Sequence, residues 1–335
     1  MKKRNSIFQL LLVSLITILV LPQLPLPLQN VNEYPVFQKS EHFDSNEEIV
    51  FISDTQEPIW IETILLDRNN NLIARDLIFK EIVRNNPRKV IHLGDIVAFG
   101  YKDESWKPID NYLYKLLKKN IGFYPTLGNH ELLLFSDAGE EQFNKRFPFY
   151  SKTGYSINNG ETEIILLNSN FSKMTEEEIE KQQSWYKNKL DELEKNSTIS
   201  AIVIGTHYPP FTNSKIVSPD EDVQKLFVPL FLKSKKGKLF ISGHCHAFEH
   251  FKQKGKDFLV IGGGGGLQQP LYVGDEAKWK DGYDSENPLR MFHYLNYKVE
   301  NDTICITLKI LEKNFSKFEN SYRITIPLKR TKGFN

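Results

Sequence analysis

Short runs of apolar residues recur along the chain, and several end in a polar residue that can take part in chemistry. Each run has the length of a β-strand and is rich in β-branched and aromatic side chains. Because the runs are almost continuously apolar, they suit strands that are buried on both faces of a sheet. The expected strands cover residues 49–53, 89–94, 122–128, 201–206 and 238–243.

Helical patterns separate several of these strands. Apolar residues at helical spacing predict helices over residues 72–83, 112–117 and 176–193. The third begins with Thr175 before three glutamates, which is the pattern of an N-cap followed by an acidic first turn. Strands that alternate with helices indicate an α/β fold.

The pattern changes to neighbouring strands in two places. Residues 154–170 contain two strand-like runs around a turn at 158–160, which is the signal of a hairpin. Two further strands are expected over 293–299 and 303–310, and residues 323–328 can add a last one.

The N-terminus has the layout of a targeting segment. Three basic residues precede an apolar run over residues 7–21, and prolines follow it. Residues 1–29 are therefore expected to be a signal peptide or a signal anchor, with a retained anchor favoured because no cleavage motif follows. A linker is expected over 30–46, one domain over 47–328 and a basic tail over 329–335. The basic flank would stay inside the cell and place the domain outside the cytoplasm, anchored or secreted.

Composition narrows the class of protein. A hydrophobic fraction of 40% with 12% aromatic residues is enough for a packed core. The 43 basic and 42 acidic residues leave a net charge of +1, which argues against a nucleic-acid partner. Two cysteines are too few for a disulfide scaffold or a cysteine-based zinc site.

Five of the predicted strands run into residues that can bind a metal ion. Ligand sites in α/β folds lie beyond the carboxyl ends of strands, so these side chains are expected to meet. They combine carboxylate, amide and imidazole groups, which suit Zn, Mn or Fe. The donors are too many for one tetrahedral ion, and two ions that share a carboxylate fit better. The candidates are Asp54, Asp95, Asn129 with His130, His207, His244 and His246.

Each candidate also has an ordinary structural explanation when it is taken alone. Asp54 and Asp95 could cap helices, and His207 could be a loop histidine. His244 and His246 alternate along an extended segment, so both can point to one side, as a metal requires. The joint occurrence of such residues at five strand ends favours the metal interpretation.

In order and approximate spacing, these residues resemble the successive motifs of the calcineurin-like metallophosphoesterases. The likeness extends from about Glu47 to at least Gly266. It implies a two-sheet α/β sandwich flanked by helices, in four αββα layers. The matching stretches are Asp54-Thr55-Gln56, Gly94-Asp95, Gly128-Asn129-His130-Glu131, His207 and Gly243-His244-Cys245-His246.

The resemblance implies a site for two divalent or trivalent metal ions, of Mn, Zn or Fe. It places Asp54 and His246 on the first ion and makes Asp95 a bridge between both. The second ion would take the remaining ligands, Asn129, His207 and His244. His130 would be catalytic, either stabilising the phosphoryl oxygens or protonating the leaving oxygen. The implied reaction is hydrolysis of a phosphomonoester or phosphodiester by direct attack of a water that bridges the metals.

The sequence departs from the family pattern at two positions. Gln56 stands where many members have histidine, and an amide can bind a metal or hold a water but is a weaker donor than imidazole. Ala98 stands where the purple acid phosphatase branch has a ligating tyrosine, which argues against an iron-tyrosinate centre. Gln56 keeps a second hypothesis open, a metal-binding but catalytically weak protein that acts by interaction at the cell surface.

The partner expected from the resemblance is a small or macromolecular phosphate ester, with membrane contact through the N-terminal anchor. The sequence leaves the oligomeric state open. Specificity is expected to come from loops over residues 99–106, 132–150, 211–222 and 268–290. The glycine run 262–266 is expected to be a flexible loop beside the site.

Overall fold

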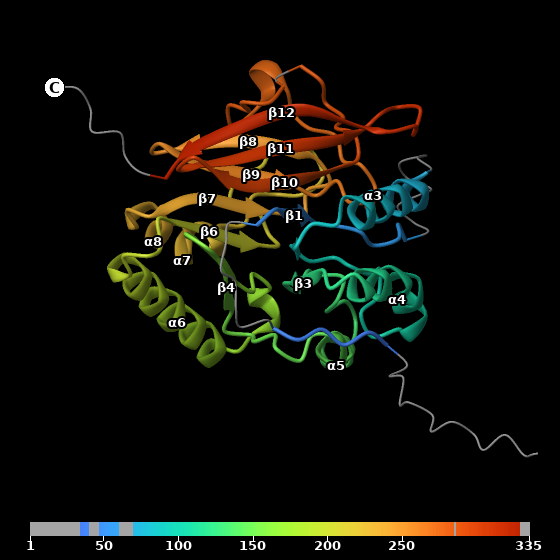
Figure 1. The fold of residues 1–335 in the computed structure, drawn as a ribbon, viewed down its shortest axis with the longest axis horizontal. Coiled ribbons are helices and arrows are strands. Elements are labelled where there is room, and N and C mark those ends of the chain that lie inside the picture. Colours follow the sequence, from blue (N-terminus) through green and yellow to red (C-terminus); the bar gives the residue numbers. More distant parts are fainter. Residues whose placement is uncertain (1–33, 40–46, 60–69, 285, 329–335) are drawn as a thin grey trace, which may run out of the picture. The chain divides into compact units, whose positions relative to one another are not determined.

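Two mixed six-stranded sheets stack face to face in the described part of the chain, residues 34–39, 47–59, 70–284 and 286–328 of the computed structural model (Figure 1). The first contains, in spatial order, β12 (Phe318–Pro327), β11 (Thr303–Leu311), β10 (His293–Glu300), β1 (Ile49–Ile52), β2 (Lys89–His92) and β3 (Gly122–Pro125). The second contains β4 (Tyr155–Asn159), β5 (Thr162–Leu166), β6 (Ala201–Thr206), β7 (Gly237–Ser242), β9 (Lys256–Ile261) and β8 (Phe248–Gln253).

Helices cover the outer face of each sheet and complete four layers (Figure 1). The first sheet packs against α3 (Asn71–Asn85), α4 (Asp103–Lys118) and α5 (Ser136–Arg146). The second packs against α6 (Glu176–Lys195), α7 (Glu221–Leu226) and α8 (Val228–Lys233). Short 3-10 helices lie at Phe171–Lys173 and Gly274–Glu276. The four-layer α/β sandwich expected from the resemblance is confirmed.

The continuous apolar runs are explained by this layering. In β1, Phe51 faces the second sheet, whereas Val50 and Ile52 face the helices. All of these side chains are buried, because alternate residues of a strand point to opposite faces and both faces are covered. Tyrosine hydroxyls add polar links between the sheets, as where Tyr155 donates to the carbonyl of Pro125 at 2.7 Å.

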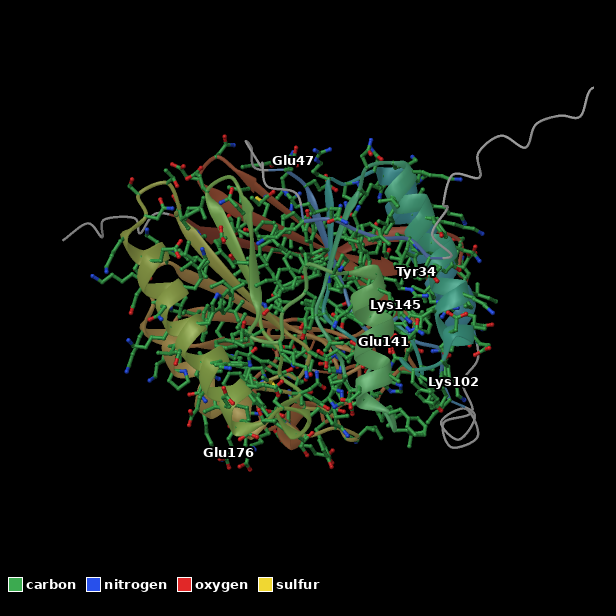
Figure 2. The ribbon with its side chains drawn as sticks, turned by 90° about the horizontal axis from the view of Figure 1, so that it is seen from below. Tyr34, Glu47, Lys102, Glu141, Lys145 and Glu176 are labelled. Atoms are coloured by element: carbon green, nitrogen blue, oxygen red, sulfur yellow. The ribbon has the colours of Figure 1, made fainter. Side chains whose placement is uncertain are left out.

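The expected central strands are present, and so is the capped helix. Thr175 accepts a hydrogen bond from the backbone N–H of Glu178, and the Glu178 carboxylate accepts one from the N–H of Thr175. This reciprocal capping box satisfies two of the N–H groups that a helix start leaves unpaired. Figure 2 shows Glu176, the first residue of α6, at the surface.

Several elements differ from the expectation. Helix α4 begins at Asp103, well before the expected residue 112, and β12 begins at Phe318 rather than at 323. Helix α5 occupies part of the stretch 132–150 that was expected to be a loop. Its sequence is mostly polar, and it is held by tertiary contacts. The Arg146 guanidinium binds both carboxylate oxygens of Asp110, at 2.7 and 2.6 Å.

The two ends of the chain are described only in part. The predicted signal or anchor over 1–29 and the basic tail over 329–335 lie outside the described residues. Within the expected linker, Phe37 is buried against the rings of Phe123 and Phe147. This part of the linker is therefore packed onto the domain. None of the helices in the described ranges has the length and apolar character that crossing a bilayer requires.

A buried carboxyl on β8 predicts a pH-dependent stability. Glu249 accepts hydrogen bonds from the Thr212 hydroxyl and the Asn213 N–H, and burial raises its pKa from 4.5 to about 7. The folded state thus binds the extra proton, so stability falls as the pH rises from about 4.5 to about 7. We expect Glu249→Gln to gain about 3 kcal/mol over wild type across that window, measured by urea unfolding. A difference that does not change with pH would contradict this.

Candidate metal centre

The carboxyl ends of five strands meet at one edge of the sandwich. Parallel β1, β2 and β3 end there in the first sheet, and parallel β6 and β7 end there in the second. The chain turns sharply after three of these strands, because Asp54, Asp95 and His244 have left-handed φ angles of 60°, 56° and 66°. Such angles are uncommon for residues other than glycine, and they occur often at functional sites.

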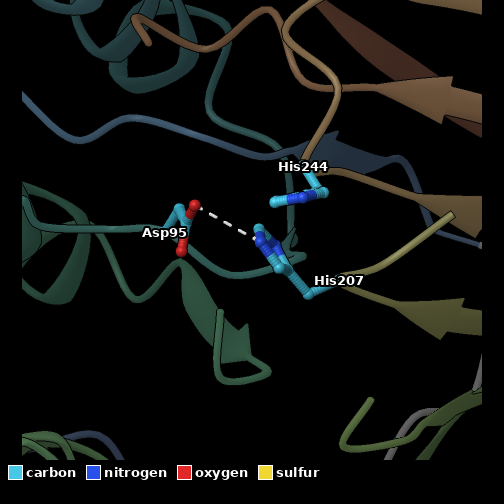
Figure 3. Close-up of side chains that lie close together, drawn as sticks. All are labelled: Asp95, His207 and His244. Carbon is cyan, nitrogen blue, oxygen red and sulfur yellow. Dashed lines mark ion pairs between the residues drawn. The ribbon is translucent and has the colours of Figure 1, made fainter. Parts of the chain in front are cut away.

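The first group of donors comes from both sheets. Asp95, His207 and His244 each offer a ligand atom, and these atoms lie within 4.8 Å of one another. The His207 Nε2 is 3.3 Å from the Asp95 Oδ2 (Figure 3). Asn129 joins this group, because its Oδ1 is 3.0 Å from the same His207 nitrogen.

The second group shares Asp95 with the first. Asp54, Asp95 and His246 also bring their ligand atoms within 4.8 Å of one another. The His246 Nε2 is 3.4 Å from the Asp54 Oδ1. Gln56 lies beside this group, with its Nε2 3.2 Å from the His246 Nε2 and 3.5 Å from the Asp95 Oδ2.

Backbone carbonyls orient the two histidines that face the carboxylates. The His207 Nδ1 lies 2.8 Å from the carbonyl of Leu93, and the His246 Nδ1 lies 2.7 Å from that of Leu267. Because a carbonyl only accepts, each Nδ1 carries a hydrogen and donates it. The Nε2 of each ring is thereby directed to the carboxylates, as in histidines that bind metals.

His130 lies beside the same centre and is largely buried. Its backbone N–H donates to the Asp95 Oδ1 at 2.8 Å, and its Nδ1 is 3.0 Å from the carbonyl of Ala98. Its Nε2 faces Asp95 at 4.0 Å from the Oδ2. The structure therefore brings together all eight residues singled out from the sequence, which are Asp54, Gln56, Asp95, Asn129, His130, His207, His244 and His246.

Opposite charges inside the centre shift its pKa values. Burial pushes the pKa of Asp54 and Asp95 upward, but contacts with His246 and His207 outweigh it, and both pKa values fall below the usual range. Burial opposes the charged form of His207, yet the neighbouring Asp95 raises its pKa to about 9. For His244, burial and the charge of His207 outweigh the attraction of Asp95 and Asp54 and lower its pKa to about 3.

The donor set fits metal ions. Two buried carboxylates face imidazoles, and Asp95 belongs to both groups. The Gln56 Oε1 is buried without a hydrogen-bond partner, which is costly for an amide oxygen unless a cation lies near it. Carboxylate, imidazole and amide oxygen are ligands for Zn, Mn and Fe.

The sequence comparison agrees with this geometry. A sequence profile of the calcineurin-like phosphoesterases matches residues 48–248. The chain belongs to the calcineurin-like phosphoesterases. A comparison with curated proteins finds no match.

Solved structures show where this calcineurin-like phosphoesterase fold recurs. GAP50, the anchor in the inner membrane complex of Plasmodium, is 15% identical with a TM-score of 0.66, over 86% of this chain and 91% of that one. Purple acid phosphatase PPD1 from yellow lupin seeds is 15% identical with a TM-score of 0.60, over 85% of this chain and 54% of that one. A dimetal phosphatase from Danio rerio is 14% identical with a TM-score of 0.53, over 85% of this chain and all (100%) of that one.

One residue of this calcineurin-like phosphoesterase gained a role only from the structure. Glu131 is fully buried, and its carboxylate accepts hydrogen bonds from the backbone N–H groups of Asp95, Ile96, Val97 and Gly128. It ties the loop after β2 to the loop after β3, and so it positions Asp95. The sign of this role in the sequence was the position of Glu131, an acidic residue directly after His130 in a segment that follows a buried strand.

The glycine run 262–266 is packed against the centre, in contrast to the flexible loop expected from the sequence. The N–H of Gly264 donates to the carbonyl of Ser53 at 3.0 Å, and the N–H of Gly266 donates to that of Asp54 at 2.7 Å. Glycine is required at Gly266, because a Cβ there would lie 2.6 Å from the His246 ring. The run supports the backbone that carries the second group.

We expect Gly266→Ala to displace the His246 imidazole and to lower the affinity of the second group for metal by roughly 10–100-fold. The first group should keep its ion, because it does not include His246. Calorimetric titration of the protein with Zn measures the metal affinities of both groups. Gly282→Ala is the matched control, since a Cβ there meets only an ordinary contact of 3.4 Å. Two unchanged sites in Gly266→Ala would contradict the expectation.

Proposed function

We propose that the protein is an extracytoplasmic metal-dependent phosphoric ester hydrolase that uses two metal ions. The observation that carries the proposal is the sharing of Asp95 by two donor groups, beside His130. We assign the second group, Asp54, Asp95 and His246 with Gln56, to the first ion. We assign the first group, Asp95, His207 and His244 with Asn129, to the second ion. When bound, such a pair of ions acts as a Lewis acid on the phosphoryl oxygens and makes water a stronger nucleophile.

The residues of the chain supply orientation and a proton. Asp95 is held by the N–H of His130, and its loop is fixed by Glu131, so the two groups keep their spacing. With its Nδ1–H donated to the carbonyl of Ala98, His130 directs its Nε2 toward the donor groups, 4.0 Å from the Asp95 Oδ2. In its protonated form that nitrogen donates to the leaving oxygen of the ester, which is a task suited to imidazole.

Metal counting with a simple assay tests the proposal. Full-length protein is purified without chelator, its metals are counted by elemental analysis, and hydrolysis of an aryl phosphate monoester and diester is measured. We expect about two ions per chain and turnover that falls by roughly 10²–10⁴-fold in His130→Ala with its metals retained. One ion or none, with no turnover after Mn, Zn or Fe is added, would overturn the proposal.

A second candidate is a metal-binding surface protein with weak catalysis. Gln56 supports it, because the position beside His246 and Asp95 holds an amide in place of an imidazole. The GAP50 structure, described as an anchor in a membrane complex, shows that a similar fold can serve as an anchor. The predicted N-terminal anchor would bring either kind of protein to a membrane surface.

Gln56→His separates the two candidates. If Gln56 marks a degenerate site, the imidazole should raise metal affinity and turnover at least about tenfold, because it is the better donor. For the working hydrolase that we propose, we expect changes below about threefold in both, since the other donors already hold the ion. Calorimetric metal titration and aryl phosphate turnover measure the two effects side by side.

A further inference from the structure

Exposed apolar side chains lie on segments at the same edge of the sandwich as the candidate metal centre. Seven large apolar residues are exposed in the described ranges of the chain, and six of them lie in the segments that follow β1, β3, β6 and β9, whose carboxyl ends share the edge that carries the centre. We call these six the apolar rim. They are Leu72 (50% exposed), Ile73 (52%), Leu134 (68%), Phe135 (58%), Ile216 (55%) and Tyr272 (43%).

The most exposed pair of the rim follows His130. The N–H of Leu133 donates to the carbonyl of His130, and the N–H of Phe135 donates to that of Leu133 at 2.8 Å. Leu134 at the tip has a φ of 65°, an unfavourable conformation for a bulky side chain, which the loop nevertheless keeps. The Phe135 ring packs edge-on against that of Tyr101 at 4.8 Å, and an open cavity of about 530 Å³ borders the pair.

The other two pairs are connected, through hydrogen bonds of neighbouring residues, to the segments beside His246. The N–H of Gln269 donates to the carbonyl of His246, and the chain continues from Gln269 to Tyr272. Ile216 lies beside this stretch, because the N–H of Lys215 donates to the carbonyl of Pro270 at 2.9 Å. Leu72 and Ile73 follow Asn71, whose side chain donates to the carbonyls of Gly265 and Gly266.

Lysines sit on aromatic rings at two places along the rim. The Lys102 ammonium lies 4.4 Å from the ring centre of Phe99 and 5.5 Å from that of Tyr101. The Lys215 ammonium lies 4.9 Å from the Tyr272 ring, and Glu276 is 3.7 Å from it. Such a combination suits the surface of a bilayer. Apolar and aromatic side chains can contact the acyl chains there, and lysine ammonium groups can contact the lipid phosphates.

We propose that the apolar rim docks on a lipid surface, and that the substrate is a phosphate ester carried by a lipid in that surface. The substrate class rests on the proposed function, whereas the docking does not. Leu133 is hydrogen-bonded to His130, so the apolar part of an ester bound at His130 would lie close to Leu134 and Phe135. When the protein is docked, a lipid needs to leave the bilayer only as far as the centre. Its acyl chains are then not fully exposed to water, which would be costly.

A fluorescent label on the full chain tests the docking. Phe135→Cys and Leu117→Cys are each made in a Cys305→Ser background, since the remaining Cys245 is fully buried. Leu117 is the matched control, because it is exposed but lies near Gly122 at the far end of β3. The N-terminal segment is the same in both proteins, so its contribution cancels.

On vesicles of equal parts phosphatidylcholine and phosphatidylglycerol, we expect the label at position 135 to shift to the blue. A nitroxide in the acyl chains should quench it, and the label at 117 should respond to neither. No response at 135, or equal responses at 135 and 117, would overturn the docking.

Turnover tests the substrate class. Phosphatidic acid in vesicles is compared with a soluble aryl phosphate. We expect the ratio of the two rates to fall at least about tenfold in Leu134→Ser/Phe135→Ser and to stay unchanged in Leu117→Ser. Turnover of a soluble phosphoprotein but not of the lipid would overturn the lipid substrate. Turnover of the soluble aryl phosphate without a blue shift of the label at position 135 would support the proposed hydrolase and refute the docking. A blue shift at position 135 without turnover of any substrate would support the docking and refute the hydrolase.

Discussion

Asp95→Asn is expected to empty both halves of the metal centre and to lower phosphate ester hydrolysis by at least about a thousandfold. Asp95 is the one residue that belongs to both donor groups of the described site. The amide keeps the size of the side chain, and its oxygen can still accept the N–H of His130. The negative charge and the second oxygen are lost, and these are what a bridging ligand supplies.

A comparison with Asp54→Asn makes this prediction specific. Asp54 belongs to one donor group only, so its variant should lose about one ion per chain and keep the other. Elemental analysis of both variants, with turnover of an aryl phosphate, gives the result. Retention of two ions and wild-type turnover in Asp95→Asn would contradict the shared role. Equal metal loss in the two variants would show that the groups do not bind separately.

Glu131→Ala is expected to have the largest effect on stability, a loss of about 4 kcal/mol in the free energy of unfolding. It would leave four backbone N–H groups without an acceptor in the interior. Each unsatisfied buried donor costs about 1–3 kcal/mol, and partial relaxation or water entry reduces the sum. Urea unfolding in the presence of a chelator measures the loss without a contribution from bound metal.

Two further variants test the cause. In Glu131→Gln one oxygen remains, so two of the four donors face an amide NH₂ group, and we expect about half of the loss. Glu141→Ala removes an exposed glutamate on α5 that pairs with Lys145 at 2.9 Å (Figure 2). Such a surface pair contributes little, so the change should stay within about 0.5 kcal/mol. Similar losses for Glu131→Ala and Glu141→Ala would refute the role of Glu131.

The sequence by itself determined the parts of the molecule that follow from local pattern. The capping box at Thr175 and the hairpin around 158–160 depend on residues close together in the chain. The candidate ligands could also be predicted, although they are far apart in sequence. Parallel strands end at a common edge, so polar residues at five strand ends must converge.

Only the tertiary structure decided what depends on contacts between distant segments. Helix α5 is mostly polar, and it is held by contacts with distant residues, such as the Arg146–Asp110 pair and the packing of Phe143 against Trp106. Glu131 acquires its role from N–H groups of another loop, and the glycine run acquires its own from the backbone beside Asp54 and His246. The apolar rim likewise exists because four separate segments follow strands that end at one edge of the sandwich. The burial and hydrogen bonding of these residues depend on which distant segments pack together, and no local pattern in the sequence records that.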